Sequence, residues 1–245
     1  MILPKGRNDV PVGRPRTAGN AAKMLTAATR NRNNVRGSRR MDVPFCSQRG
    51  LVHTDDTALL PEPGARWSDR TCAIACLTMV LNYYGHVVSM VDVLTAALER
   101  KAFDPVRGWL HSGLIEVLQS FGLTAYRRNW RLLDGRESAY LAGRDPTATA
   151  RREIQLVKDQ MLAEGLRTIR LLLAAGLPVV VSIHRPWRDR SSVGHQVVLV
   201  GLDADRVTYH DPAERAGAFL RHGRADFFES WKGTAIVAGL SPSRG

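Results

Sequence analysis

The run CAIACLTMVLNYYG, residues 72–85, is the most informative part of the chain. Within it, apolar residues recur at helical spacing over 75–85, and Gly85 is a typical helix stop. Cys72 lies where this helix begins, so the unpaired N–H groups and the dipole of the helix favour its thiolate form. Its candidate N-caps are Ser68, Asp69 and Thr71.

Helical patterns fill the part of the chain that follows this run, and strand patterns fill the last third. Further helices are predicted over residues 89–101, 111–121 and 151–175, the last of them broken near Gly165. Strands are predicted over residues 124–130, 178–184, 195–203, 206–211 and 234–239, with loops at 49–68 and 143–149. Helices first and an antiparallel sheet second predict an α+β domain.

Two of the predicted strands bring a histidine and an aspartate together. The strand that starts at His195 enters an acidic turn, and the next strand ends at Asp211, 16 residues after His195. Because the two ends of a tight antiparallel hairpin are neighbours, Asp211 can orient the His195 ring and stabilise its imidazolium. His210 alternates to the other face of the strand and is the poorer candidate.

The remaining cysteines and histidines follow less specific patterns. Cys76 falls on the apolar face of the first helix and Cys46 has no evident chemical neighbour, so both are expected to be structural. His111 is expected either to cap its helix or to pack near the site. Surface or edge positions are expected for His53, His86, His184 and His222. Taken alone, the order Cys–His–Asp leaves a catalytic site and a chance arrangement equally open.

Several segments together resemble the peptidase C39-like group of papain-fold cysteine peptidases. In order, they are VPFCSQ, CAIACLTMVLNYYG, GWLHSGLIEVLQSFGL, LLAAGLPVVVSI, GHQVVLVGLD, HDP and FFESWKGTAIVA. The similarity covers nearly all of residues 42–238. It implies a papain-like fold in which an N-terminal helical part, with the nucleophile at a helix start, packs on a C-terminal antiparallel sheet. It also implies that Cys72 is the nucleophile, His195 the general base and Asp211 its orienting residue.

The resemblance further assigns Gln48 to the oxyanion hole, together with the backbone N–H of Cys72. Gln48 precedes Cys72 by 24 residues, so the intervening loop must fold back. One departure is visible, because the family usually has glycine directly after the nucleophile and this chain has Ala73. The extra methyl group is expected to narrow the acyl pocket.

The implied activity is hydrolysis of a peptide or amide bond in a peptide or protein substrate, through a thioester at Cys72. Two alternatives remain open, namely an acyltransferase or transpeptidase on the same scaffold and an inactive peptidase-like binding module. Gly108-Trp109 and Trp187 are candidates either for the substrate groove or for core packing. No cofactor or metal is expected, because phosphate-loop, dinucleotide and metal-ligand spacings are missing.

Most of the positive charge lies at the start of the chain. The 245 residues carry a formal net charge of +12, of which residues 1–40, with ten bases and one acid, hold +9. Such a composition predicts that residues 1–40 form a flexible, disordered basic arm. The resemblance implies that a C39-like domain follows over residues 41–245. An organellar transit peptide and a nucleic-acid-binding arm are alternatives. Nucleic-acid binding is the weaker, because no aromatic residue precedes Phe45.

The same sequence excludes several classes of protein. Three cysteines are too few for a disulfide scaffold. No stretch approaches the roughly 18–20 apolar residues of a membrane span. A secretory signal would need an apolar block of about 7–15 residues, which the leader does not have, so a cytoplasmic location is expected. The oligomeric state is not encoded in any pattern that we find.

Overall fold

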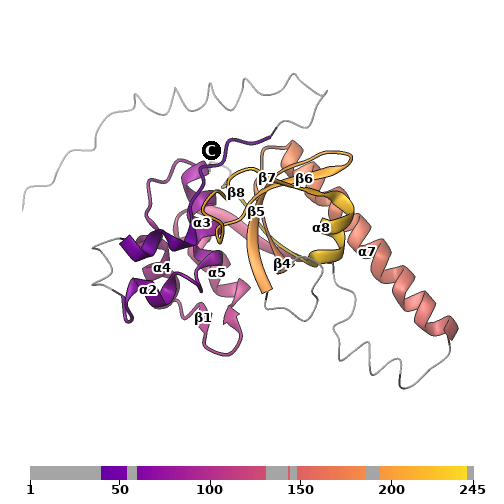
Figure 1. The fold of residues 1–245 in the computed structure, drawn as a ribbon, viewed down its shortest axis with the longest axis horizontal. Helices are drawn as coiled ribbons and strands as arrows, with labels where there is room; N and C mark the ends of the chain where they lie inside the picture. The colour runs from indigo at the N-terminus through magenta and orange to yellow at the C-terminus, as the bar shows by residue number, and fades with distance from the viewer. Residues whose placement is uncertain (1–39, 54–59, 131–142, 144–147, 186–193, 242–245) are drawn as a thin grey trace, which may run out of the picture. The chain divides into compact units, whose positions relative to one another are not determined.

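Helices from the first half of the chain lie beside an antiparallel sheet built by the second half (Figure 1). The computed structural model describes residues 40–53, 60–130, 143, 148–185 and 194–241. Its helices are η1 (Gln48–His53), α2 (Gly64–Trp67), α3 (Cys72–Tyr83), α4 (Met90–Glu99), α5 (His111–Ser120), α7 (Ala148–Ala174) and α8 (Arg224–Ser230). The predicted α+β class is confirmed.

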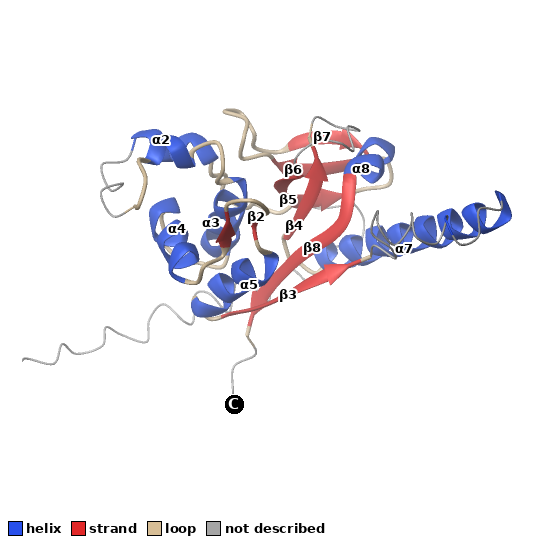
Figure 2. Ribbon diagram, turned by 90° about the horizontal axis from the view of Figure 1, so that it is seen from below, coloured by secondary structure: helices blue, strands red, loops and turns tan. Residues whose placement is uncertain are grey.

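The main sheet has six strands in the order β3-β8-β4-β5-β6-β7, and all its neighbouring strands are antiparallel (Figure 2). Its strands are β3 (Leu123–Asn129), β4 (Val179–His184), β5 (Gly194–Leu202), β6 (Arg206–His210), β7 (Leu220–Gly223) and β8 (Trp231–Leu240). A separate two-stranded ribbon joins β1 (Phe103–Asp104) to β2 (Gly108–Trp109). The predicted hairpin is β5–β6, and its acidic turn is closed by Asp203, whose Oδ1 accepts the backbone N–H groups of Asp205 and Arg206.

Helix α3 is the buried element that joins the two parts of the fold. Every residue from Ala73 to Leu81 is buried, and the helix packs against both β5 and α4. Two hydroxyl groups anchor its C-terminal end: Tyr83 donates to the carbonyl of Gly176 at 2.9 Å and Tyr84 to that of Ala238 at 2.7 Å. Because the helix is held along its length, its first residue has a defined place against the sheet.

One of the three N-caps predicted for α3 is confirmed in position only. Thr71 stands at the N-cap position, but its hydroxyl makes no cap bond and donates instead to the carbonyl of Gln48 at 3.4 Å. Ser68 ends α2, with its hydroxyl donating to Ala65, and Asp69 is exposed. A tertiary contact has therefore taken the hydroxyl of Thr71, and a local contact in α2 has taken that of Ser68. In contrast, Ser89 opens α4 with a complete capping box, as the sequence indicates.

The break predicted near Gly165 is wrong, because α7 runs without interruption from Ala148 to Ala174. Gly165 is buried, and a Cβ there would lie 2.5 Å from the Trp231 ring and 2.9 Å from the Trp130 ring. These two rings pack with centroids 5.3 Å apart. The glycine therefore provides room for the tryptophan pair and does not end the helix. Most of the predicted 143–149 loop lies outside the described residues, and Ala148 is already helical.

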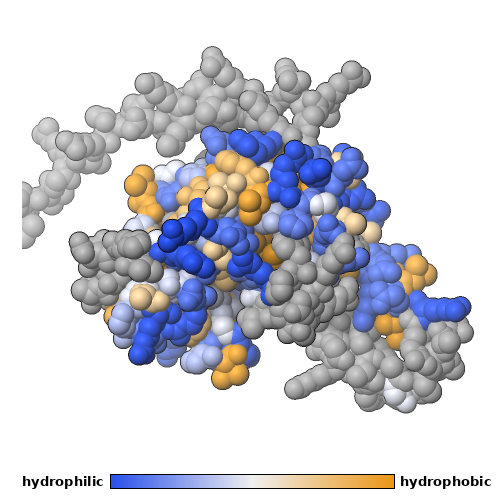
Figure 3. Space-filling model, in the orientation of Figure 1, coloured by the Kyte–Doolittle hydropathy of each residue, from blue (hydrophilic) through white to orange (hydrophobic). Residues whose placement is uncertain are grey.

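Short elements with no sequence signal account for the remaining differences. These are η1, α2, α8, β7 and the β1–β2 ribbon, each of at most seven residues. Charged and polar residues cover most of the described surface in the view of Figure 3, with hydrophobic residues in small separate patches. Within the described residues, no helix has the length and apolar character needed to cross a membrane.

Replacing Gly165 with alanine tests the packing role of this glycine. Helix propensity alone would stabilise the variant by about 1 kcal/mol. Overpacking against the tryptophans costs about 1–3 kcal/mol, so we expect a net loss of stability and a lower Tm by thermal denaturation. The shorter ring of Trp231→Phe should recover part of that loss in the double variant. A Tm equal to or above that of the parent protein would show that the helix tolerates the methyl group.

Candidate active site

Cys72 is the first residue of α3 and is half-buried at one wall of a cleft of about 890 Å³. The cleft lies between the start of this helix and the β4–β7 side of the sheet. Its lining residues are Asp69, Cys72, Arg185, Gly194, His195, Tyr209, Asp211, Glu214, Ala216, Leu220 and His222. Three of the four residues predicted for the site, Cys72, His195 and Asp211, therefore line one cavity.

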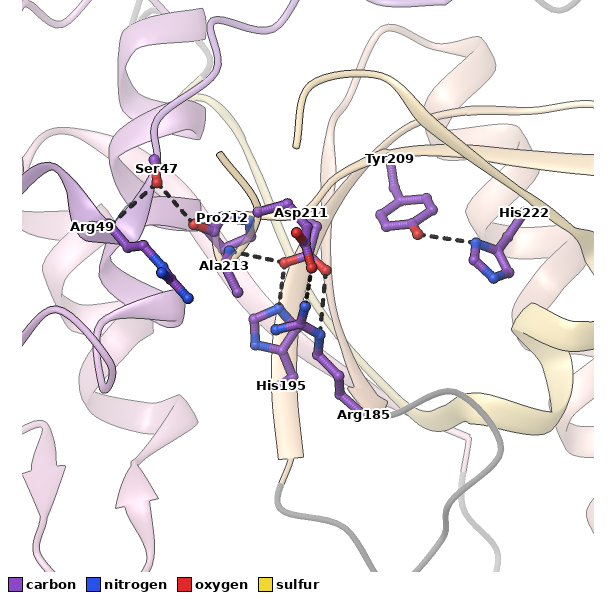
Figure 4. Close-up of polar contacts among 10 residues, drawn as sticks. Ser47, Arg49, Arg185, His195, Tyr209, Asp211, Pro212, Ala213 and His222 are labelled. Carbon is purple, nitrogen blue, oxygen red and sulfur yellow. Dashed lines mark hydrogen bonds and ion pairs between the residues drawn. The ribbon is translucent and has the colours of Figure 1, made fainter. Parts of the chain in front are cut away.

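His195 and Asp211 form the central polar contact of the cleft. The Nε2 atom of His195, the second residue of β5, lies 2.7 Å from Oδ1 of Asp211, which directly follows β6 (Figure 4). The strand register explains the contact: His210 pairs with Val198, so Asp211 projects from the opposite face of the sheet, the face that carries His195. Both groups are buried, at 8% and 3% exposure.

The Cys72 side chain lies beside the His195 ring and contributes to the raised pKa of that ring. Because Nε2 faces Asp211, the other ring nitrogen, Nδ1, is the one left for the thiol. Burial alone lowers the pKa of His195, but the bond to Asp211 and the contact with Cys72 outweigh it and raise the pKa to about 9. The ring is therefore an imidazolium at neutral pH.

A tight loop holds Asp211 in place. Its Oδ1 accepts the backbone N–H of Ala213 at 2.9 Å, and its own N–H donates to the carbonyl of Gly217 at 2.9 Å. A Cβ on Gly217 would lie 1.9 Å from the Asp211 carbonyl oxygen, so the loop closes only with glycine there. Burial raises the pKa of Asp211, but its contacts with His195, Ala213 and Arg185 lower it overall, so the group is a carboxylate.

Gln48 is tied through its backbone to the segments that carry Asp211 and Cys72. Its N–H donates to the carbonyl of Pro212 at 2.9 Å, and its carbonyl accepts the hydroxyl of Thr71. One partner follows Asp211 and the other precedes Cys72, so the intervening loop does fold back. The side chain is 5% exposed, and its Oε1 accepts no hydrogen bond from the described residues. Ser47 strengthens the tether, because its hydroxyl also donates to Pro212 at 3.2 Å (Figure 4).

The other two cysteines lie in environments that keep them protonated. Burial raises the pKa of Cys46 to about 11. Cys76 is fully buried on α3, and burial together with nearby negative charges raises its pKa well above the ordinary value. Both features agree with the structural roles expected for these residues.

Three of the other histidines have defined partners. His210 is buried on the face opposite His195, where Nε2 donates to the Val43 carbonyl and Nδ1 accepts the N–H of Phe219, each at 2.9 Å. His111 is the first residue of α5 and does not cap it, because Leu110 is the N-cap. Its Nε2 lies 3.2 Å from the Ser182 hydroxyl. His222 lies 3.0 Å from the Tyr209 hydroxyl in the wall of the cleft.

Sequence patterns did not indicate several residues of the cleft. Tyr209, Arg185 and Glu214 were not singled out, and His222 was placed only at the surface or an edge. Alternation along β6 could have found Tyr209, which shares a face with Asp211.

Trp109 packs with Trp67 and Phe103, and Trp187 and the side chain of His53 lie outside the described part. Among the residues that the structure describes, no group of three His, Cys, Asp or Glu side chains could hold a metal.

The fold and the cleft define a papain-like domain, with a cysteine at a helix start facing a histidine on an antiparallel sheet. The family model described as Peptidase_C39 like family matches residues 40–238, and the chain belongs to this family. No curated protein matches the chain.

Three solved structures are similar to the chain at low sequence identity. A protein from Bacillus anthracis assigned as a C39-like peptidase is 18% identical, with a TM-score of 0.50, and the match covers 85% of this chain and 100% of that one. A double glycine motif protease from an AMS/PCAT transporter, solved with the leader peptide, is 16% identical, with a TM-score of 0.47 and coverage of 84% and 96%. The peptidase domain of Streptococcus ComA is also 16% identical, with a TM-score of 0.44 and coverage of 71% and 93%.

The environments of the three cysteines predict selective alkylation. Below pH 8 in the folded protein, iodoacetamide should modify Cys72 faster than free cysteine and leave Cys46 and Cys76 unmodified, because only Cys72 lies beside an imidazolium. The rate advantage should end as the pH rises through about 9, where His195 loses its proton. Peptide mapping by mass spectrometry measures this, and His195→Ala is the control that removes the advantage. Equal modification of all three thiols would contradict the assignment.

Proposed function

We propose that this protein is a cysteine peptidase in which Cys72, His195 and Asp211 form the catalytic triad. The observation that carries the proposal is the 2.7 Å contact between the His195 ring and Asp211, in the same cleft as a cysteine at a helix start. Membership of the Peptidase_C39 like family supports it and points to peptide substrates.

The first half of the reaction forms a thioester. The Cys72 thiolate attacks the carbonyl carbon of the scissile amide, and a C–S bond forms as the carbonyl π bond becomes an oxyanion. The imidazolium of His195 then gives its proton to the amide nitrogen, the C–N bond breaks, and the amine leaves. Asp211 keeps the ring oriented and stabilises the charge that it carries before this transfer.

The second half releases the acyl group. His195, now neutral, accepts a proton from a water molecule while the water oxygen attacks the thioester carbonyl. The C–S bond breaks, the carboxylic acid leaves, and the thiolate–imidazolium pair is restored. No external oxidant, reductant or cofactor enters the balance. If an amine replaced water in this half, the same thioester would give a transferase product.

Gln48 and the backbone N–H of Cys72 are proposed to stabilise the oxyanion. The tethers of Gln48 to Thr71 and Pro212 hold it beside both catalytic segments, which supports this role. Because Cys72 is the first residue of α3, its N–H has no partner within the helix. Two donors held in position before the reaction stabilise the developing charge without reorganisation.

Single substitutions at the two cysteines of α3 test the nucleophile. Cys72→Ala should abolish cleavage of a peptide library, and Cys76→Ala should retain it, because Cys76 is a fully buried side chain.

Product masses distinguish the reactions: hydrolysis leaves a free carboxylate, whereas added glycine amide would be incorporated by a transferase. Equal loss of activity in both variants would overturn the nucleophile assignment. Absence of any covalent adduct with acyl inhibitors would favour a binding module.

Replacing Gln48 tests the oxyanion hole. Removing one donor to an oxyanion typically lowers the rate about 10²–10³-fold, so Gln48→Ala should lower kcat by that factor. The donor acts on charge that exists only in the transition state, so KM should change little. The rate of Cys72 alkylation serves as the control and should stay close to that of the parent, because no oxyanion forms in that reaction. A small change in kcat would show that Gln48 has only a structural role.

A further inference from the structure

Arg185 extends the polar network of the cleft beyond the proposed triad. It directly follows the last residue of β4, and its Nε lies 3.8 Å from Oδ2 of Asp211. Its Nη2 donates a hydrogen bond to Oε1 of Glu214, in the loop that follows Asp211. Figure 4 shows the Arg185 side chain alongside His195, with contacts from both groups meeting at the Asp211 carboxylate.

The two oxygens of Asp211 have separate partners. Oδ1 contacts His195 and accepts the N–H of Ala213, whereas Oδ2 faces Arg185. Rotation of the carboxylate would disturb both sets of contacts. Arg185 therefore favours the orientation in which Oδ1 is directed at the imidazole ring.

The charges along this chain of contacts alternate in sign. His195 is positive, Asp211 negative, Arg185 positive and Glu214 negative. The side chain of Asp211 is 4% exposed, against 35% for Arg185 and 51% for Glu214. The outer pair is therefore partly screened by water, so it can adjust the field at the imidazolium but not dominate it.

We propose that Arg185 and Glu214 are positioning residues that orient Asp211 and set the strength of its charge at His195. Arg185 holds the free oxygen of the carboxylate and offsets part of its charge, and Glu214 in turn offsets the charge of Arg185. The inference rests on the proposed roles of His195 and Asp211. In this arrangement Arg185 and Glu214 adjust the proton affinity of His195 from the other side of the Asp211 carboxylate.

Other groups near His195 come from each element around it and stay constant in the test. Cys72 lies at the start of α3, Tyr209 on β6 and His222 on β7, and Asp69 lines the cleft just before α3. On β8, the Nζ of Lys232 lies 2.8 Å from the place of a Cβ on Gly194.

The alternating charges predict shifts of opposite sign in two variants. Arg185→Met removes a positive charge near the imidazolium, so His195 should titrate at a higher pH. Glu214→Gln leaves Arg185 uncompensated, so His195 should titrate at a lower pH. Near a protein surface each shift should be about half a pH unit. In the double variant, His195 should titrate at a pH close to that of the parent. Arg185→Lys keeps the charge, so it should shift the titration less than Arg185→Met does.

The experiment is NMR titration of the His195 imidazole in the full chain and in these four variants, from pH 6 to about 10.5. The titration observes the ring directly and needs no substrate. If the parent protein had no peptidase activity, the proposed function would be refuted but this test would still apply. Opposite shifts in Arg185→Met and Glu214→Gln are the supporting result. Shifts of the same sign, or no shift in either, would overturn the proposal. If Arg185→Met fails to fold, the downward shift of Glu214→Gln decides alone.

Discussion

The hydrogen bond between His195 and Asp211 is the contact on which the rest of the site depends. It joins the start of β5 to the end of β6, and it forms because the strand register places both side chains on one face. The loop after Asp211 closes against that residue at Gly217, where a side chain would have no space. A buried carboxylate held this firmly keeps the imidazole charged and oriented, and so determines what the facing cysteine can do.

The second constraint is the rigid placement of α3 between the sheet and the other helices. Tyrosine hydroxyls anchor its C-terminal end, and Thr71 and Gln48 connect its N-terminal end to the first segment of the chain. Gln48 is bonded in turn to Pro212, next to the aspartate. Three segments far apart in sequence therefore meet through the backbone groups of Gln48. These groups are the same in every residue, which explains why Gln48 could be assigned only through a resemblance.

The sequence was most informative where local rules and tertiary packing agree. The α3 run, the β5–β6 hairpin and the start of α4 at Ser89 all follow from periodicity and turn chemistry. The rules failed where a side chain served a distant partner. Gly165 was interpreted as a helix break because the approach of two tryptophans cannot be seen in one segment, and Thr71 was interpreted as a cap although its hydroxyl reaches Gln48.

The sequence by itself determined the α+β class and the pairing of His195 with Asp211, because each depends on spacing within a segment or across one hairpin. It determined the family through the resemblance of several segments. Only the tertiary structure decided what surrounds that pair. Arg185, Glu214 and His222 come from different parts of the chain, and nothing in their local sequence marks them as neighbours. The physical reason is that charge and hydrogen bonding act through space, whereas periodicity records only the backbone path of one element.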